Sequence, residues 1–349
     1  MSGTIKVLIV DDSALMRQLL TQILTSDPGI QVIGAASDPF AAREKIKALN
    51  PDVLTLDIEM PRMDGLTFLE KLMRGHPMPV VMISSLTEKG ADTTLRALSL
   101  GAVDFITKPK LDVSTGTLDQ AEEIVAKVKA AAWAHLRHNI TPATPPVEVQ
   151  RKDFRFSATH KVVAIGSSTG GTEALRDLLA PLPADFPGIV IVQHMPEAFT
   201  RPFAERLNSI CRIHVAEARD GDRILQGHAL LAPGGHQMGI VSHGAESTVR
   251  VYRGERVNRH MPSVDVLFNS CAKQLGKNAL GVILTGMGND GAQGMLEMKQ
   301  ADAYTIAQDE ASCVVFGMPK EAIKLGGVEE ILPLSRIGQA LIDRLTRAA

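Results

Sequence analysis

The chain lacks the features of secreted, membrane-spanning and nucleic-acid-binding proteins. Its three cysteines are an odd number without metal-ligand spacing, which fits reduced thiols in the cytosol. No apolar stretch is long enough to cross a bilayer, and the apolar run before Asp11 is too short for a signal peptide. The 37 basic and 39 acidic residues leave a net charge of -2, so charge predicts neither nucleic acid nor an anionic membrane as a partner. We therefore expect a cytoplasmic protein with no nucleic-acid partner and no direct membrane insertion.

The chain divides into two halves that share one pattern. Short Val/Ile/Leu runs alternate with helical segments in both halves, which is typical of parallel sheets with helices on both faces. Residues 118–137 are predicted to form a closing helix, and three prolines within residues 142–146 indicate a stiff linker. We predict two doubly wound parallel-sheet domains of the α/β class, at residues 1–125 and 158–349. A helical extension and the linker would occupy residues 126–157.

In the first half, polar side chains stand where strand-like runs end. Asp11 and Asp12 end the first run, Asp57 ends the third, Ser84 ends the fourth, and Lys108 follows the fifth. Parallel strands end at one edge of a sheet, so the carboxylates are expected to form a hard-oxygen site suited to Mg²⁺. A carboxylate beside that metal can attack a phosphoryl group, with Lys108 offsetting charge and Ser84 donating a hydrogen bond. The simpler alternative, that Asp11 and Asp12 only cap a helix, leaves the other strand ends unexplained.

Because of these side chains, residues 1 to about 125 resemble response-regulator receiver domains. The match is carried by Val10-Asp11-Asp12-Ser13, Asp57, Pro61, Asp64-Gly65, Ser84, and Phe105 before Lys108-Pro109. The resemblance implies a flavodoxin-like fold in which a histidine kinase supplies the phosphoryl group to Asp57. It also implies that Mg²⁺ is held by Asp12, Asp57 and the main-chain carbonyl of Glu59, with Asp11 contributing through water. Ser84 and Phe105 would form the switch pair, in places where many receivers have Thr and Tyr.

In the second half, three apolar runs lead into turns that carry reactive side chains. Ser168 lies in Gly166-Ser167-Ser168-Thr169-Gly170, a G-x-S-x-G elbow that exposes a serine oxygen between a strand and a helix. The apolar residues 189–192 lead into Gln193 and His194, and Asp290 lies in a glycine-dense turn after residues 280–284. Glycines there let main-chain N–H groups approach a reacting oxygen. We predict that the three side chains converge as nucleophile, base and orienting acid.

Several alternatives are weighed against this interpretation. The order Ser, His, acid differs from the α/β-hydrolase order, so that fold is not expected. Asp265 and Asp309 compete for the role of the acid, and Cys313 is interpreted as a buried packing residue rather than a nucleophile. A response regulator with a nucleotide-binding effector domain is the alternative function, although residues 166–171 do not have the G-x-G-x-x-G spacing. DNA binding would need a basic helix-turn-helix or winged domain after the linker.

Over its whole length the sequence resembles the chemotaxis response regulators that act as protein-glutamate methylesterases. The matching segments of the second half are residues 165–173, 193–195, 232–236, 262–265 and 284–291. The resemblance implies a three-layer α/β/α Rossmann-like esterase domain that needs no cofactor for its own reaction. It implies hydrolysis of glutamyl methyl esters, and deamidation of glutamines, on methyl-accepting chemotaxis receptors. The N–H of Met287 would help to form the oxyanion hole, with Thr169 close by, and phosphorylation would relieve a block that the receiver imposes.

Two loop segments are also expected near the site. Residues 232–236 are predicted to form a loop beside it, although a plain turn is nearly as consistent with the sequence. Residues 259–265 are predicted to begin a helix, with Pro262 in its first turn and Asp265 favourable at the positive end of the helix dipole.

Overall fold

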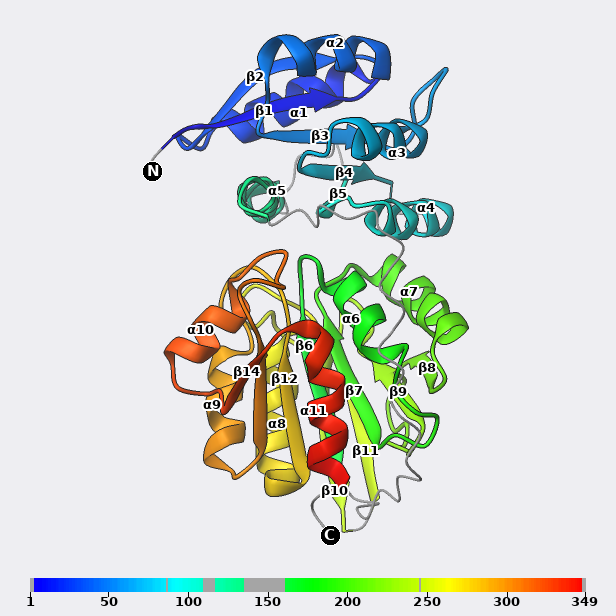
Figure 1. Cartoon of the computed structure of the whole chain (residues 1–349), viewed down its shortest axis with the longest axis vertical. Coiled ribbons are helices and arrows are strands. Elements are labelled where there is room, and N and C mark those ends of the chain that lie inside the picture. Colours follow the sequence, from blue (N-terminus) through cyan, green and yellow to red (C-terminus); the bar gives the residue numbers. More distant parts are fainter. Residues whose placement is uncertain (1–2, 86, 109–116, 135–160, 245, 347–349) are drawn as a thin grey trace. The chain divides into compact units, whose positions relative to one another are not determined.

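The computed structural model describes residues 3–85, 87–108, 117–134, 161–244 and 246–346. The chain splits into two compact units, residues 1–140 and 141–349, and each has its own parallel sheet (Figure 1). The closing helix of the first unit ends at Ala132, so it is shorter than the predicted segment up to residue 137. The proline-rich linker at residues 142–146 lies outside the described residues. The predicted domain limits at 125 and 158 stay predictions.

The first unit is a five-stranded parallel sheet between two helical layers. Its strand order is β2-β1-β3-β4-β5, and α1 and α5 pack together on one face while α3 and α4 pack together on the other. The strands are β1 (Ile5–Val10), β2 (Ile30–Ala36), β3 (Val53–Asp57), β4 (Val80–Ser84) and β5 (Asp104–Thr107). The helices are α1 (Ala14–Thr25), α2 (Pro39–Leu49), α3 (Gly65–Gly75), α4 (Glu88–Ser99) and α5 (Thr117–Ala132).

The second unit is a seven-stranded parallel sheet with the order β14-β13-β12-β6-β7-β9-β8. Its strands are β6 (Val162–Ser167), β7 (Gly188–Gln193), β8 (His214–Glu217), β9 (His228–Leu231), β12 (Ala279–Ile283), β13 (Tyr304–Gln308) and β14 (Glu330–Leu332). The helices are α6 (Gly171–Leu179), α7 (Glu197–Ile210), α8 (Val264–Leu275), α9 (Ala292–Gln300), α10 (Met318–Lys324) and α11 (Leu334–Thr346), with a short 3-10 turn at Gly276–Asn278. Two antiparallel strands, β10 (Gln237–His243) and β11 (Glu246–Tyr252), form a separate hairpin against α8.

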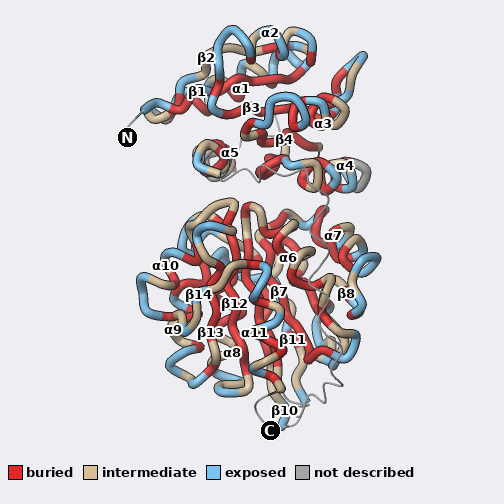
Figure 2. The backbone as a smooth tube through the Cα atoms, in the orientation of Figure 1, coloured by how far each residue is buried: buried red, intermediate tan, exposed pale blue. Residues whose placement is uncertain are grey.

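The central strands are buried on both faces, which explains their continuous apolar sequence. Every residue of β6, β7 and β12 is buried, and Figure 2 shows the strands in the buried colour beneath partly exposed helices. Helices α8 and α9 cover one face of the sheet, and α6 packs against α11. The two predicted doubly wound α/β domains are confirmed as two parallel sheets with alternating helices. Within the described ranges, none of the helices combines the length and apolar character that crossing a bilayer requires.

Helix α8 begins later than its sequence predicts. Ser263 is its N-cap, and the Ser263 hydroxyl accepts a hydrogen bond from the N–H of Val266. Pro262 therefore lies before the helix, so its predicted place in the first turn is wrong, whereas Asp265 is in the first turn as expected. Val264 packs closely, because a Cβ added to either Gly166 or Gly291 would collide with its side chain. The start of α8 is thus pressed against both β6 and the turn after β12.

Candidate functional site

Ser168 lies in the tight turn between β6 and α6. Its N–H donates to the carbonyl of Thr285 at 3.0 Å, and its carbonyl accepts from the N–H of Gly171 at 2.7 Å. Gly170 has a φ of +77°, and a Cβ added there would lie 2.6 Å from Cβ of Val314, so only glycine fits. The turn is therefore the strand-to-helix elbow that the G-x-S-x-G motif predicts.

His194 follows β7 directly and lies next to this elbow. Strands β6 and β7 pair so that Ser167 is opposite Gln193, which brings the next residues, Ser168 and His194, to neighbouring strand ends. The buried Gln193 amide joins the two turns. Its Oε1 accepts from the Ser167 hydroxyl at 2.7 Å, and its Nε2 donates to the carbonyls of Ser168 at 2.9 Å and His194 at 3.1 Å. The position of the serine relative to the histidine is thus fixed by a side chain that sequence reasoning did not select.

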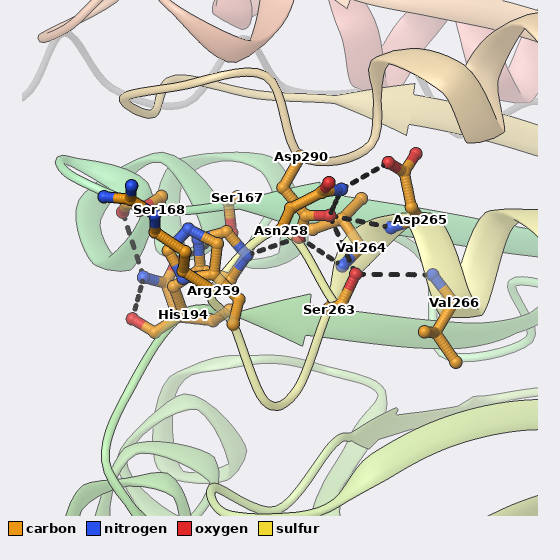
Figure 3. A network of polar contacts seen from close by, with 12 residues as sticks. Ser167, Ser168, His194, Asn258, Arg259, Ser263, Val264, Asp265, Val266 and Asp290 are labelled. Carbon is orange, nitrogen blue, oxygen red and sulfur yellow. Dashed lines mark hydrogen bonds and ion pairs between the residues drawn. The ribbon is translucent and has the colours of Figure 1, made fainter. Parts of the chain in front are cut away.

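Asp290 contacts the histidine from the turn after β12. Its Oδ2 is 2.8 Å from Nε2 of His194, as Figure 3 shows, and it also accepts from the N–H of Val264 at 2.7 Å. The other oxygen, Oδ1, accepts from the Ser263 hydroxyl at 2.7 Å and from Nδ2 of Asn258 at 2.8 Å. The carboxylate therefore lies at the N-terminus of α8, where the helix dipole favours negative charge.

These contacts determine the ionisation of Asp290. Burial alone would raise the pKa of its carboxyl, but the hydrogen bond and charge of His194 act in the opposite direction. Hydrogen bonds from Asn258 and Ser263 add to that effect, so the pKa lies well below its usual range. Asp290 is therefore an ionised group throughout the physiological pH range.

The two ring nitrogens of His194 differ in their hydrogen bonds, and one face of the ring is covered by another side chain. Its Nδ1 is buried and makes no hydrogen bond within the described part of the chain, while Nε2 is held by Asp290. His260 stacks on the ring, with 3.7 Å between the ring centroids and an interplanar angle of 10°. His260 belongs to the segment, residues 259–265, that was predicted only to begin a helix, and no local signal would have placed it against His194.

The competing acids and Cys313 do not contact the histidine. Asp265 accepts from Asn258 and from the N–H of Gly294, and Asp309 accepts from the N–H and hydroxyl of Ser312. Cys313 is 1% exposed, and burial raises the pKa of its thiol to about 12, which suits a packing residue better than a nucleophile.

The glycine-rich turn of Asp290 also approaches Ser168. A Cβ added to Gly286 would lie 2.7 Å from Cβ of Ser168 and 3.1 Å from its backbone nitrogen. Met287 follows Gly286 directly, so it belongs to the same turn. The buried Thr169 accepts at its carbonyl a 3.0 Å hydrogen bond from the Thr285 hydroxyl, which fixes the same turn to the elbow. The turn that contains Met287 thus lies against the elbow of the predicted nucleophile, and the oxyanion role of Met287 and Thr169 stays a prediction.

The loop at residues 232–236 packs on the segment that leads into α8. The N–H of Gly235 donates to the carbonyl of Met261 at 3.1 Å, and His236 lies 3.4 Å from Nε of Arg253. The loop therefore supports the His260 side of the site, which agrees with its predicted location beside it.

In the first unit, three carboxylates meet at the end of the sheet. Oxygens of Asp11, Asp12 and Asp57 lie within 4.8 Å of one another, and Nζ of Lys108 is 2.9 Å from the Asp57 carboxylate. Ser13, rather than either aspartate before it, supplies the side-chain cap of α1. The simpler explanation of the Asp-Asp pair as a helix cap is therefore wrong for this chain.

The cluster has the properties of a Mg²⁺ site. Asp11 Oδ2 is buried without a hydrogen-bond partner among the described residues, and burial together with the charge of Asp57 raises the pKa of Asp11 to about 6. Burial also raises the pKa of Asp57, despite the opposing hydrogen bond and charge of Lys108. Hard oxygen donors that repel one another in this way fit a small divalent cation. Glu59 is adjacent, since its N–H donates to Asp57 Oδ1 at 3.3 Å.

The two residues of the predicted switch pair, Ser84 and Phe105, are buried, and each contacts a side chain of a neighbouring helix. The Ser84 hydroxyl is 2.7 Å from the Thr94 hydroxyl and 3.4 Å from the carbonyl of Gly90, both on α4. Phe105 is 4% exposed, and Nζ of Lys127 lies 5.0 Å above its ring. Ser84 thus links the edge of the sheet to α4 in this structure, and its predicted hydrogen bond to a phosphoryl group stays a prediction.

Known proteins resemble both units. A family model described as CheB methylesterase matches residues 163–341, and one described as response regulator receiver domain matches residues 7–118. A protein-glutamate methylesterase/protein-glutamine glutaminase of Geobacter metallireducens is 60% identical over 351 residues, which cover 98% of this chain and 96% of the relative. The chain belongs to the CheB methylesterase family.

Other members of the CheB methylesterase family agree with this assignment. A relative of the same name from Salmonella typhimurium is 56% identical over 342 residues, covering 98% of this chain and 97% of its own. The crystal structure of the Thermotoga maritima CheB methylesterase catalytic domain superposes with a TM-score of 0.52 at 38% identity, covering 53% of this chain and 98% of that one. The predicted fold and the predicted enzyme class, a carboxylic ester hydrolase joined to a receiver, are therefore confirmed.

Proposed function

We propose that the chain hydrolyses glutamyl methyl esters, and deamidates glutamines, on methyl-accepting chemotaxis receptors, and that phosphorylation of the receiver increases this activity. The observation that carries the proposal is the 2.8 Å contact between His194 and Asp290 at the strand end beside Ser168. The names of the relatives support the substrate class. We place the reaction in the cytoplasm.

Ser168 acts as the nucleophile and His194 as its base. The Ser168 hydroxyl attacks the ester carbonyl and gives its proton to Nδ1 of His194, the ring nitrogen that Asp290 does not engage. Asp290 orients the ring and stabilises the imidazolium that forms. The N–H of Met287, with Thr169 nearby, donates to the oxygen that becomes negative, because the turn at Gly286 lies against Ser168.

The tetrahedral intermediate collapses when His194 returns the proton to the leaving group. Methoxide then leaves as methanol, or the amide nitrogen leaves as ammonia, and the glutamyl group remains as an ester on Ser168. Water attacks this ester while His194 takes its proton, which releases the glutamate carboxylate and restores the serine hydroxyl. These steps use only the side chains and N–H groups of the catalytic unit.

The receiver supplies the regulation. Asp57 accepts a phosphoryl group from a histidine kinase, and Asp12, Asp57 and the carbonyl of Glu59 would hold Mg²⁺, with Asp11 contributing through water. When bound, the cation would supply positive charge that offsets the negative charge gathered at Asp57 on phosphorylation. Lys108, already 2.9 Å from Asp57, stabilises the same negative charge, and Ser84 and Phe105 report the modification by rearranging.

The nucleotide-binding alternative is less well supported. Residues 166–171 lie beside His194, whose imidazole contacts Asp290, and the segment 163–341 matches the CheB methylesterase model.

The direct test is Ser168→Ala, assayed by methanol release from a methylated receptor fragment. Members of a catalytic triad act as a unit, so the rate should fall by several orders of magnitude. The small side chain leaves no cavity, and the thermal unfolding curve should be unchanged. Ser335→Ala, an exposed serine on α11, is the matched control and should keep full activity. Retention of about a tenth of the activity by Ser168→Ala would show that the nucleophile is misassigned.

A further inference from the structure

A basic turn lies beside the active site and takes no part in the chemistry derived above. Residues 250–259 contain four arginines and one glutamate, in a chain whose net charge is -2. Arg253, Arg256 and Arg259 are exposed, and we call these three residues the arginine turn. The turn leads directly into His260, whose ring stacks on His194.

The conformation of the arginine turn is held by contacts with the catalytic unit. Val257 and His260 form a two-way backbone bridge, and the two residues between them, Asn258 and Arg259, have φ values of 51° and 69°. Two consecutive non-glycine residues in the left-handed region are costly, and such strain persists where the surroundings impose it, often at functional sites.

The side chain of Asn258 anchors the tip of the turn. Its Nδ2 donates to Asp290 Oδ1 at 2.8 Å and to Asp265 Oδ2 at 2.6 Å, so the tip is tied to the proposed catalytic acid. At the base of the turn, the buried Gln237 amide donates to the carbonyls of Glu255 at 2.9 Å and His260 at 3.3 Å. The turn therefore presents its side chains from a fixed backbone.

The arginines are directed by further polar contacts around the site. Nε of Arg253 is 3.4 Å from Nε2 of His236, in the loop that supports His260. Nη1 of Arg256 is 3.4 Å from the carbonyl of Arg259, across the turn. Figure 3 draws Arg259 on the Ser168 and His194 side of the network, away from Asp265. Positive charge is thus concentrated beside the catalytic unit.

We propose that the arginine turn binds carboxylate side chains that flank the scissile ester or amide on the protein substrate. The proposal rests on the proposed function and extends it to substrate selection. Every turnover of that reaction leaves a carboxylate, so a substrate segment with several modified positions becomes more acidic around the remaining esters. Guanidinium groups suit this partner, because their planar donors match a carboxylate and stay charged at all relevant pH values.

The test uses two peptides that each carry one glutamate methyl ester. Glutamates flank the ester in one peptide, and alanines flank it in the other. For the unmodified protein, the KM for the acidic peptide should be lower than the KM for the alanine-flanked peptide. Added salt should reduce that difference because the charges are exposed. Arg253→Gln and Arg256→Gln should each raise the KM for the acidic peptide about two- to fivefold, the range for an exposed ion pair, with kcat unchanged.

Two further variants separate charge from structure. Arg256→Lys keeps the charge and should retain most of the preference for the acidic peptide. Arg336→Gln, at an exposed arginine on α11, should leave the KM for both peptides unchanged. An unchanged ratio of kcat/KM between the peptides in the double variant Arg253→Gln/Arg256→Gln would overturn the proposal. So would an equal fall in kcat on both peptides, because that result would make the turn only a support for His260. Failure of the proposed function looks different: the unmodified protein would hydrolyse neither peptide.

Discussion

Asp57 and Asp290 occupy similar places in two parallel sheets, yet their surroundings push their ionisation in opposite directions. Asp57 ends β3 and Asp290 lies in the turn after β12. Both are almost completely buried, and each lies within 3 Å of a nitrogen, on Lys108 and His194 respectively. Asp290 also accepts hydrogen bonds from Asn258, Ser263 and the start of α8, and its pKa falls. Asp57 lies near two other carboxylates, and burial raises its pKa.

The difference shows how one residue type can serve two purposes. Asp290 has its charge fully solvated by the protein, so it can orient an imidazole without reacting. Because its folded-state pKa is depressed, it favours folding above the unfolded value of about 4 and loses this contribution as the pH falls through the folded value. Asp57 has too few hydrogen-bond donors to offset the negative charge of the carboxylates around it. A cation such as Mg²⁺, bound together with a phosphoryl group, would therefore stabilise the ionised form of this cluster.

The largest expected effect concerns the orienting acid. Asp290→Asn should reduce ester hydrolysis by about 10⁴-fold, because the neutral amide cannot stabilise the charged His194. Asp265→Asn should be much milder, since Asp265 contacts Asn258 and Gly294 rather than the histidine. Initial rates on a nitrophenyl ester would check both variants. If Asp265→Asn reduced the rate more than Asp290→Asn, the orienting acid would be Asp265, and the comparison of Asp57 with Asp290 would not describe the catalytic site.

A second prediction concerns the reactive carboxylate. Asp57→Asn should leave the basal esterase rate unchanged and abolish stimulation by a phosphodonor, because the amide cannot form an acyl phosphate. Allosteric coupling of this kind is typically about 5- to 150-fold. Methanol release with and without phosphodonor and Mg²⁺ measures it. Full stimulation of the variant would remove Asp57 from the mechanism.

A third prediction separates the two units. Residues 141–349 form a compact unit with their own sheet, so a fragment of residues 154–349 should fold and remain an esterase. If the receiver imposes a block, the fragment should be faster than the unphosphorylated full chain, by up to the stimulation factor above, and insensitive to phosphodonor. Rates on one receptor substrate decide the point. A fragment no faster than the full chain would exclude the blocking mechanism.

The smallest expected effect is on stability. Binding of Mg²⁺ to the folded receiver alone should raise its unfolding free energy by about 2–3 kcal/mol when the ion is near 100 times its dissociation constant, which corresponds to several degrees in Tm. The catalytic unit should melt at the same temperature with and without the ion. Calorimetry with Mg²⁺ or chelator tests this, and Asp12→Asn should weaken the shift. A Mg²⁺-dependent shift in the catalytic unit instead would contradict the assignment of the acidic cluster.

Much of both sites followed from one rule about parallel strands. Ser168 and His194 each follow a fully buried strand, Asp57 is the last residue of another, and parallel strands end at a common edge of their sheet. The proximity of Ser168 to His194 and Asp290 within one unit, and of Asp57 to Lys108 within the other, could therefore be predicted from sequence alone. Their catalytic roles remain predictions that the experiments above address.

The missed features depend on tertiary packing. His260 and Asn258 belong to a long connection without apolar periodicity, and their contacts with His194 and Asp290 arise only when β10 and α8 are in place. Gln193 was not singled out from the sequence, although its amide donates to the carbonyls of both Ser168 and His194. The start of α8 was predicted too early in the sequence, because proline is common in the first turn of a helix and Pro262 was placed there. The Ser263 side chain provides the cap instead, so the helix begins after Pro262.

The close packing of Val264 has a practical consequence for anyone who wishes to retune this enzyme. The methyl groups of this valine occupy the space that side chains at Gly166 and Gly291 would need, and its N–H binds Asp290. A slightly smaller or larger residue at position 264 would therefore shift an N–H donor of the acid while leaving every reacting side chain unchanged. Laboratory evolution toward acidic or alkaline working conditions could act through the hydrophobic core at this point, out of contact with the substrate.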